Sequence, residues 1–188
     1  MDKQILFFKS FLESPKETGS VIPSSIFLVN QMLKDVDFKA AECIVEYGPG
    51  TGCITSEILR RAGKDTKIIC FETNKRFCNY LKKNFKDKRL VLINDSAENI
   101  DSNLNNLGIT QVDYVVSGLP FANFPDSTKN NIIRETKNAL KPGGRFVTYQ
   151  YLNNLKKFLS KSFPKISTKF VAFNIPPCFV YVCEKQSK

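Results

Sequence analysis

The stretch Cys43-Ile44-Val45-Glu46-Tyr47-Gly48-Pro49-Gly50-Thr51-Gly52-Cys53 decides the fold of this chain. Its apolar first half is typical of a buried strand, and three glycines at alternate positions follow. A helical pattern then begins, with apolar residues at positions 54, 58, 59 and 62. A strand that turns this tightly into a helix brings backbone N–H groups and a helix N-terminus towards a ligand. The turn is therefore predicted to bind a cofactor, and a glycine turn without a ligand is the alternative.

The glycine spacing argues against a dinucleotide cofactor. The dinucleotide fingerprint is Gly-x-Gly-x-x-Gly. Counting from Gly48 and Gly50 places Cys53, not a glycine, in the third slot. A dehydrogenase is therefore not the expected function.

Composition indicates one globular domain with a polyanionic partner. The 188 residues are 42% hydrophobic and carry a formal charge of +10. Apolar runs are too short for a transmembrane helix, and the charged N-terminal stretch does not have the pattern of a signal peptide. Nucleic acid or an anionic membrane surface would suit the charge, and a solvated basic surface is the alternative. The basic residues cluster at positions 60, 61, 64 and 67, at 82, 83, 86, 88 and 89, and at 156, 157, 161 and 165.

Cysteine and histidine usage excludes two classes of site. The six cysteines form no Cys-x-x-Cys pair, and the chain has no histidine. Zinc-ligand spacing and histidine-based triads are both missing, so no metal site is predicted. Buried reduced thiols in a cytosolic protein are the expected state of the cysteines.

Strands and helices alternate along most of the chain. Strands are expected over 42–47, 67–72, 89–93, 112–117 and 144–151, and helices over 53–62, 74–85 and 127–140. This alternation predicts an α/β fold with a mostly parallel sheet and helices on both faces. A helix near 152–161 and two β-rich runs, 166–174 and 178–184, follow. The two runs are predicted to close the sheet as an antiparallel pair.

Two helices are expected before the first strand. Residues 2–14 repeat apolar side chains at helical spacing, and a second helix is expected from Ser24 or Ser25 to Leu33. The first is amphipathic, with Lys3 and Lys9 opposite its phenylalanines. It would lie on anionic lipid, or it would pack its apolar stripe on the domain.

Polar residues stand where the expected strands end, and ligands of an open parallel sheet collect at that edge. Glu46 lies just before the glycine turn, within reach of the cationic end of a cofactor. Glu72 comes twenty residues after Gly52, where a carboxylate can bind ribose hydroxyls, or it could cap the next helix. Asp95, with Ser96 and Ala97, would meet an adenine, or it could form a plain Asx turn.

Ser117-Gly118-Leu119-Pro120-Phe121 follows the fourth of these strands. A loop of this kind offers a side-chain oxygen and a backbone carbonyl as acceptors for a target N–H. Such contacts would hold a nitrogen lone pair in line for attack, and Phe121 would offer an aromatic face to a cationic nitrogen. A turn with a buried phenylalanine is the alternative.

Glu46-x-Gly48-x-Gly50-x-Gly52 resembles motif I of the class I S-adenosylmethionine-dependent methyltransferases, and the Ser117 loop resembles their motif IV, typically Asn-Leu-Pro-Tyr or Asp-Pro-Pro-Tyr. With residues 11–25 and Asn174-Ile175-Pro176-Pro177, the chain is similar to bacterial-type phospholipid N-methyltransferases over nearly its whole length. More distantly it resembles the ribosomal RNA adenine dimethylases. The resemblance implies one Rossmann-like domain over 1–188 with a seven-stranded sheet, comprising an N-terminal cap or membrane-contact segment over 1–35 and a core over 41–188.

The resemblance also implies the site and the reaction. S-adenosylmethionine would be the cofactor, and the amine of phosphatidylethanolamine or a related lipid would accept the methyl group. RNA adenine N6-methylation and small-molecule N-methylation are the alternatives, and a non-enzymatic adaptor is a third. The expected location is the cytoplasm, with peripheral contact at the inner membrane face. The base would be Tyr149, Tyr151 or a water. The cofactor set is Glu46, Tyr47, Gly48, Gly50, Thr51, Gly52, Glu72, Thr73, Asp95, Ser96, Ala97 and Ser117, and the catalytic set is Ser117, Gly118, Leu119, Phe121 and Tyr151.

Overall fold

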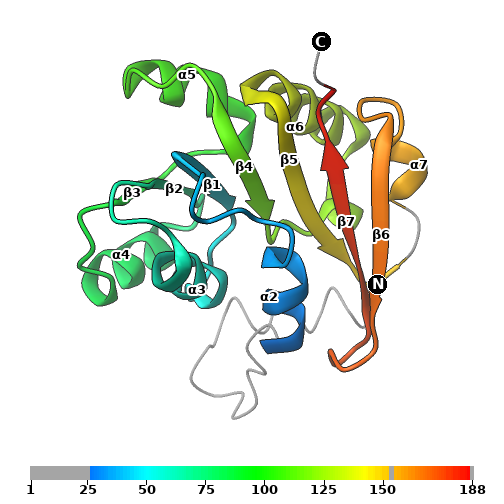
Figure 1. Ribbon diagram of the computed structural model, residues 1–188, viewed down its shortest axis with the longest axis horizontal. Coiled ribbons are helices and arrows are strands. Elements are labelled where there is room, and N and C mark those ends of the chain that lie inside the picture. The colour runs from blue at the N-terminus through cyan, green and yellow to red at the C-terminus, as the bar shows by residue number, and fades with distance from the viewer. Residues whose placement is uncertain (1–25, 153–154, 187–188) are drawn as a thin grey trace.

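A seven-stranded sheet forms the centre of the molecule in a computed structural model that describes residues 26–152 and 155–186 (Figure 1). The strand order is β3-β2-β1-β4-β5-β7-β6. The strands are β1 Cys43–Tyr47, β2 Lys67–Phe71, β3 Leu90–Ile93, β4 Val112–Ser117, β5 Leu140–Gln150, β6 Lys165–Val171 and β7 Cys178–Glu184. The first five are parallel, and β7 is antiparallel to both β5 and β6. The predicted fold is confirmed.

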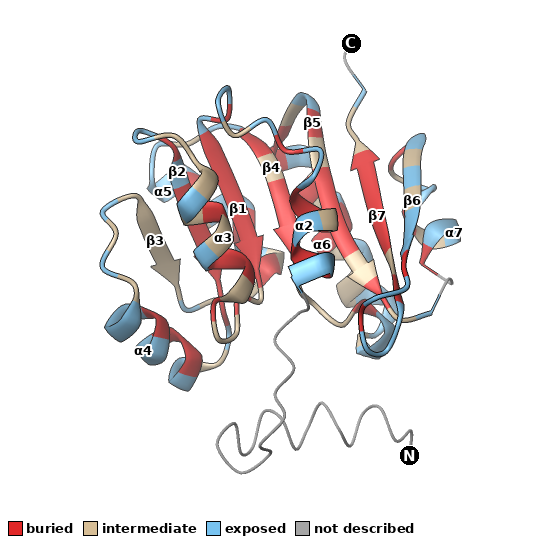
Figure 2. Cartoon of the chain, turned by 60° about the horizontal axis from the view of Figure 1, so that its bottom comes forward, coloured by how far each residue is buried: buried red, intermediate tan, exposed pale blue. Residues whose placement is uncertain are grey.

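Helices cover both faces of the sheet (Figures 1 and 2). One face packs against α2 and α3, and the other against α5, α6 and α7. Alternate residues of β1 serve the two layers: Val45 and Tyr47 face the α6 side, whereas Ile44 faces the α2 side. The helices are α2 Ile26–Leu33, α3 Cys53–Arg61, α4 Lys75–Asn84, α5 Ile100–Asn106, α6 Asp126–Ala139 and α7 Lys156–Leu159, with 3₁₀ turns η1 Ala97–Asn99 and η2 Phe121–Asn123.

The sequence prediction missed one helix and placed several boundaries differently, among them the end of β6, which is at Val171 and not at residue 174. Helix α5 was not predicted, because its sequence Ile-Asp-Ser-Asn-Leu-Asn-Asn is dominated by residues that favour turns. The turn at residues 141–144, expected to end α6, instead interrupts β5: the register jumps from Val112↔Leu140 to Tyr114↔Arg145. Helix α7 is shorter than the helix expected over 152–161. The predicted helix over residues 2–14 lies outside the described residues.

The strand order reverses direction between β1 and β4, and this switch positions the site. Successive crossovers move outward from β1 through β2 to β3, and then from β4 to β5. The loops after β1 and β4 therefore leave the sheet side by side at its carboxyl edge, the usual place for a ligand in such a sheet. Tyr47 and Ser117, the last residues of these strands, are register partners.

Candidate active site at the carboxyl edge of the sheet

The glycine turn and the Ser117 loop are in direct contact. The Gly118 N–H donates to the Tyr47 carbonyl at 2.8 Å, and the Gly48 N–H donates to the Phe71 carbonyl at 2.9 Å. A Cβ at Gly118 would lie 3.0 Å from the Gly48 carbonyl oxygen, so a side chain at this position would push the two loops apart. The structure thus brings together the two motifs that the sequence separates by about seventy residues.

Gly50 is at the open part of the turn. Its φ of +56° is in the left-handed region, and a Cβ built there would meet no atom within 4 Å. Its N–H donates to Glu72 Oε2 at 3.2 Å, while Glu72 Oε1 accepts from the Asn74 N–H at 2.8 Å. Glu72 therefore lies beside the turn. It does not cap α4, because Asn74 is the N-cap residue and its side chain accepts from the Arg76 N–H.

Glu46 is a fully buried carboxylate behind the turn. Its Oε2 accepts from Thr55 Oγ1 at 2.7 Å and from Cys70 Sγ at 3.5 Å. Its Oε1 is buried and has no hydrogen-bond partner among the described residues. Burial raises the pKa of Glu46 to about 7, although the Thr55 hydroxyl opposes the shift. An unpartnered buried carboxylate oxygen next to a ligand turn is a site that favours a cation.

These features fit S-adenosylmethionine. The cofactor carries positive charge at its ammonium and sulfonium groups, which the Glu46 carboxylate would stabilise. The unobstructed space at Gly50 would accept its methionine part, and Glu72 is placed at the neighbouring strand end, where ribose hydroxyls are expected. Among the described residues, no group of three or more histidine, cysteine or acidic side chains could hold a metal ion.

Other predicted cofactor residues are used within the fold. The Tyr47 side chain packs edge-on against Phe71 and its hydroxyl lies 3.1 Å from Thr136 Oγ1 of α6, so only its carbonyl reaches the loops. Asp95 accepts from the Ser96 N–H and from two asparagine side chains of the following turn and helix, which lowers its pKa. Thr51 and Ser96 are partly buried, Thr73 is exposed and Ala97 is buried.

The side chains of the Ser117 loop differ from the expectation in two respects. Ser117 is buried, and its Oγ accepts from the Leu119 N–H at 3.2 Å, so this hydroxyl shapes the loop. Phe121 is fully buried and packs edge-on against Phe124 and Phe146. The alternative of a buried phenylalanine describes Phe121 in this structure. When Leu119 and Pro120 are matched with Asn-Leu-Pro-Tyr, Gly118 takes the asparagine position, and backbone carbonyls remain as the acceptors.

Gln150 is a site residue that the sequence did not indicate. It ends β5 and is buried, and its Oε1 accepts from the Ala122 N–H at 3.3 Å while its Nε2 donates to the Leu119 carbonyl at 3.1 Å. One amide thus connects both sides of the Ser117 loop. Tyr151, the next residue, packs against Tyr149 on the α2 face, and burial raises its pKa. A polar residue at the end of a strand was the only available signal for Gln150.

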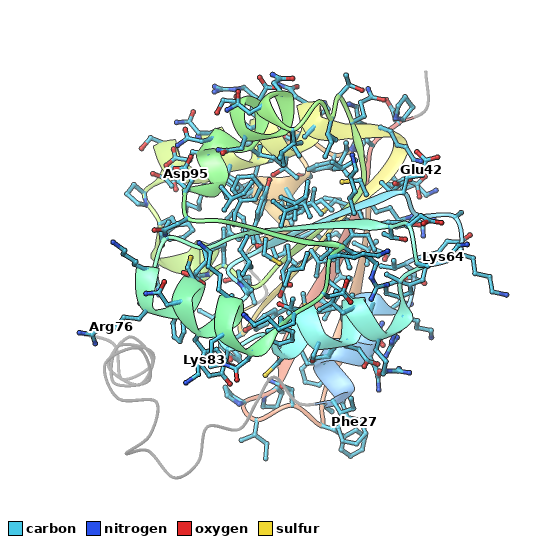
Figure 3. All side chains as sticks on the ribbon, turned by 90° about the vertical axis from the view of Figure 1, so that its left-hand side faces the viewer. Phe27, Glu42, Lys64, Arg76, Lys83 and Asp95 are labelled. Atoms are coloured by element: carbon cyan, nitrogen blue, oxygen red, sulfur yellow. The ribbon has the colours of Figure 1, made fainter. Side chains whose placement is uncertain are left out.

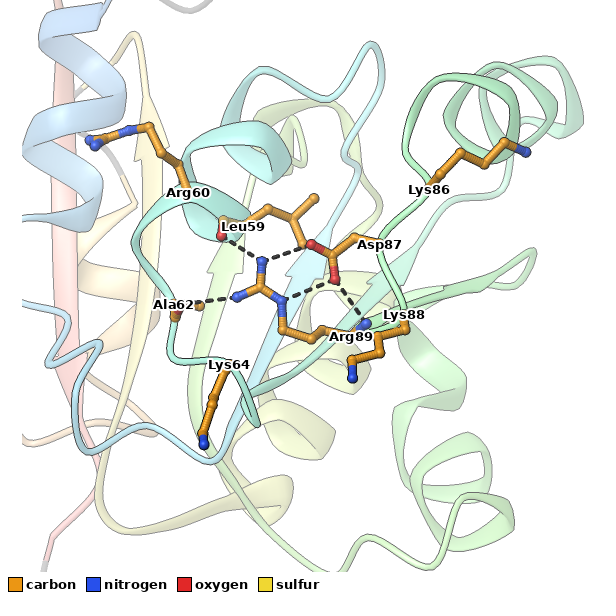
Figure 4. A pocket seen from close by; sticks show the side chains of 8 residues that line it. All are labelled: Leu59, Arg60, Ala62, Lys64, Lys86, Asp87, Lys88 and Arg89. Carbon is orange, nitrogen blue, oxygen red and sulfur yellow. Dashed lines mark hydrogen bonds and ion pairs between the residues drawn. The ribbon is translucent and has the colours of Figure 1, made fainter.

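A basic hollow in the surface lies at the opposite edge of the sheet (Figure 4). It has a volume of about 570 Å³ and five cations around it: Arg60, Lys64, Lys86, Lys88 and Arg89. Arg89 directly precedes β3, so this basic hollow is at the amino edge. Its guanidinium donates to the Leu59, Ala62 and Gly63 carbonyls and to Asp87, and therefore has no donor left for a ligand. The hollow is not the cofactor site.

Comparison with known proteins points to one family. A family model described as a methyltransferase domain matches residues 44–144, more than half of the chain. The chain is 29% identical over 180 residues to the ornithine lipid N-methyltransferase of Singulisphaera acidiphila, covering 95% of this chain and 94% of that protein. It is 25% identical over 123 residues to the probable ribosomal RNA small subunit methyltransferase A of Pyrococcus furiosus, covering 64% of this chain and 43% of that protein.

A solved structure supports the same fold. The 16S ribosomal RNA N2 methyltransferase of T. thermophilus, in complex with AdoMet and guanosine, superposes with a TM-score of 0.67. Its sequence identity is 17%, over 91% of this chain and 45% of that one. The likeness at this identity concerns the fold. No helix within residues 26–152 and 155–186 has both the length and the apolar character needed to cross a bilayer.

Proposed function

This chain belongs to the methyltransferase domain family, its cofactor is S-adenosylmethionine, and from that premise we propose that it methylates the amine nitrogen of a lipid headgroup. The observation that carries the proposal is the pairing of two loops at the carboxyl edge: a cofactor turn backed by Glu46 and an acceptor loop at Gly118 and Leu119. The relative that this chain matches over 94% of its length is named for ornithine lipid. Ornithine lipid and phosphatidylethanolamine both present a primary amine, and we propose this class of acceptor.

In the proposed reaction the chain's residues position the amine. A lipid ammonium resembles lysine, with a pKa of about 10.4, so it must lose a proton before it attacks. The Gly118 carbonyl would accept one of the amine's remaining N–H groups and help to aim its lone pair, because the Leu119 carbonyl already accepts from Gln150 Nε2 and from the Phe121 N–H. When bound, S-adenosylmethionine supplies the activated methyl group. Tyr151 follows Gln150, which binds the Ser117 loop from the end of β5, so we propose that Tyr151 orients the amine and that water removes the proton.

Methylation of an RNA adenine is the second candidate, because several relatives are ribosomal RNA methyltransferases. That reaction would need an aromatic platform for a flipped base. Phe121, the aromatic residue of the Ser117 loop, has none of its surface exposed. The burial of Phe121 favours the lipid amine.

The test is transfer of labelled methyl groups from S-adenosylmethionine to three acceptors in parallel. Vesicles containing ornithine lipid, vesicles containing phosphatidylethanolamine, and ribosomal RNA are each incubated with the full chain. Label in either lipid is expected, whereas label in RNA alone would refute the proposal.

Two glycine variants control for the cofactor. Gly50→Val is expected to abolish label transfer and cofactor binding, because the added side chain fills the space open at the turn. Gly108→Val is the matched control: Gly108 also has positive φ, at +68°, and a Cβ there also meets no atom within 4 Å, but it lies after α5. Equal loss in both variants would show that backbone strain, not cofactor exclusion, is the cause.

A further inference from the structure

Four large apolar side chains gather at the surface near the start of α2. Phe27 is 54% exposed, Phe173 77% and Ile175 72%, and Ile26 is also exposed. The rings of Phe27 and Phe173 are 5.5 Å apart, so α2 and the connection between β6 and β7 form one surface. We call Ile26, Phe27, Phe173 and Ile175 the apolar rim. Figure 2, which turns the lower end of the molecule forward, shows the start of α2 and the tip of the β6–β7 connection as exposed.

The apolar rim lies at the same edge as the candidate active site. Residues 172–177 join the end of β6 to the start of β7, where Val171 pairs with Cys178. The start of β7 pairs in turn with the end of β5, through Phe179 and Gln150. Because Gln150 binds the Leu119 carbonyl, the β6–β7 connection and the acceptor loop share the carboxyl edge.

The rim is held in an outward-facing shape. Asn174 lies between Phe173 and Ile175 and is buried, whereas both of its neighbours are among the most exposed apolar residues described. Its Nδ2 donates to the Pro176 carbonyl at 2.7 Å, which closes the tip on itself. The buried Asn174 side chain thus anchors the tip, and the exposed side chains of Phe173 and Ile175 on either side of it are available for contact with a partner surface.

Exposed basic side chains lie on the same side of the molecule as the rim. Arg76 and Lys83 of α4 are exposed, and Figure 3 shows them on the same lower side of the molecule as Phe27. Apolar side chains that enter an interface, together with basic side chains beside them, are the two components of binding to an anionic lipid surface.

We propose that the apolar rim is a membrane-docking surface, which inserts Phe27, Phe173 and Ile175 among lipid headgroups and so brings the acceptor loop to its substrate. This inference rests on the proposed lipid substrate and specifies how the site reaches it. A lipid amine cannot leave the bilayer without exposing its acyl chains, so the edge that bears the acceptor loop must face the membrane. The alternative is that residues 1–25 of this chain, which precede Ile26 in the sequence, cover the rim. The test distinguishes this alternative from binding to a membrane.

The test compares a rim variant with a control variant in vesicle sedimentation. Phe173→Ser with Ile175→Ser removes the tip of the rim. Leu107→Ser is the control, since Leu107 is an exposed apolar side chain after α5, outside both the rim and α4. Vesicles of phosphatidylethanolamine with phosphatidylglycerol are used, and melting temperature and S-adenosylmethionine affinity are measured on the same samples.

The rim variant is expected to bind vesicles about tenfold more weakly than the wild type, with unchanged melting temperature and cofactor affinity. The control variant is expected to bind like the wild type. Unchanged sedimentation of the rim variant would overturn the inference, and if its melting temperature also falls, the rim packs against the chain itself. Vesicle binding is measured without turnover, so the two proposals can fail separately. A protein that binds vesicles through the rim but transfers no label to lipid would refute the proposed substrate and not the docking surface.

Discussion

Glu46 is the residue whose environment most clearly anticipates a ligand. Its carboxylate is fully buried, one oxygen is bonded to Thr55, and the other has no partner among the described residues. Protonation lowers the cost of this burial, which is why its pKa rises to about 7. Without a nearby cation, ionised Glu46 therefore destabilises the folded protein, and a bound cation would offset this unfavourable free energy.

Glu46→Gln is expected to stabilise the cofactor-free protein in a pH-dependent way. The folded pKa of Glu46 lies above its ordinary value of 4.5, so its contribution to stability is present below pH 4.5 and is lost as pH rises to about 7. The free energy of unfolding of the variant, relative to the wild type, should thus increase across this window by roughly 3 kcal/mol. Chemical denaturation at several pH values measures it.

Glu57→Gln is the control for Glu46→Gln. Hydrogen bonds from Arg60 and Arg61 lower the pKa of Glu57 to about 2, so its contribution is complete above pH 4.5 and lost only below it. Its difference from the wild type should be nearly constant between pH 4.5 and 7. In the wild type, cofactor affinity should increase with pH up to about 7, since the cationic cofactor needs the ionised Glu46. An affinity that is independent of pH would contradict this role.

At the scale of elements, the site depends on how the ends of β1, β4 and β5 are joined. The glycine turn touches Gly118, and Gln150 of β5 binds both Leu119 and Ala122. The Ser117 loop, with the Gly118 carbonyl, is therefore positioned by three strands at once. Preorganisation of this kind matters for transfer, because small errors in the alignment of reacting atoms are costly.

Gln150→Leu is expected to lower kcat about 100-fold while leaving S-adenosylmethionine affinity within about twofold. Leucine keeps the volume but leaves the Ala122 N–H and the Leu119 carbonyl without their amide partner. Single-turnover methyl transfer and equilibrium cofactor binding separate the two effects. Thr168→Val should change neither, since it removes a buried β6 hydroxyl that has no hydrogen-bond partner within the described part of the chain. If Gln150→Leu weakened cofactor binding as much as turnover, Gln150 would be a general structural residue.

Much of this arrangement followed from the sequence. Glycine spacing and the alternation of strands and helices predicted the sheet, the paired motifs and the placing of Glu46 and Glu72. Side-chain direction was harder to predict. Phe121 and Tyr47 occur within the motifs, but packing against Phe146 and Thr136 turns them into the core. Gln150 was missed since its contacts depend on how β5 lies beside β4, which one sequence does not reveal.

At the scale of the whole molecule, the two edges of the sheet have different tasks. The carboxyl edge bears both loops and the apolar rim. The amino edge is closed by polar contacts: Asp113 accepts from the Glu42 and Cys43 N–H groups at 2.9 Å and forms an ion pair with Lys141. Arg89 donates hydrogen bonds to the Leu59 and Ala62 carbonyls and so satisfies backbone groups at the end of α3. Stability and function are thus largely separated in space.

Asp113→Ala is expected to lower the free energy of unfolding by about 3 kcal/mol, because two backbone N–H groups of β1 lose their acceptor. Asp113→Asn keeps an oxygen for these groups and loses mainly the partly exposed ion pair, so about 1 kcal/mol is expected. Denaturant titration measures both. S-adenosylmethionine affinity of the folded variants should stay unchanged, and a large change would show that the two edges are coupled.

The chain leaves the fold at the amino edge. The Lys185 N–H donates to the Gly144 carbonyl and the Gly143 N–H donates to the Lys185 carbonyl, both at 2.9 Å, which fixes the path of the chain after β7 (Figure 1). A tether attached beyond Lys185 therefore departs on the side away from the glycine turn and the apolar rim. Protein immobilised by its C-terminal end on a sensor chip would be oriented with the edge of the candidate active site towards the flowing analyte, whether vesicles, nucleic acid or small amines.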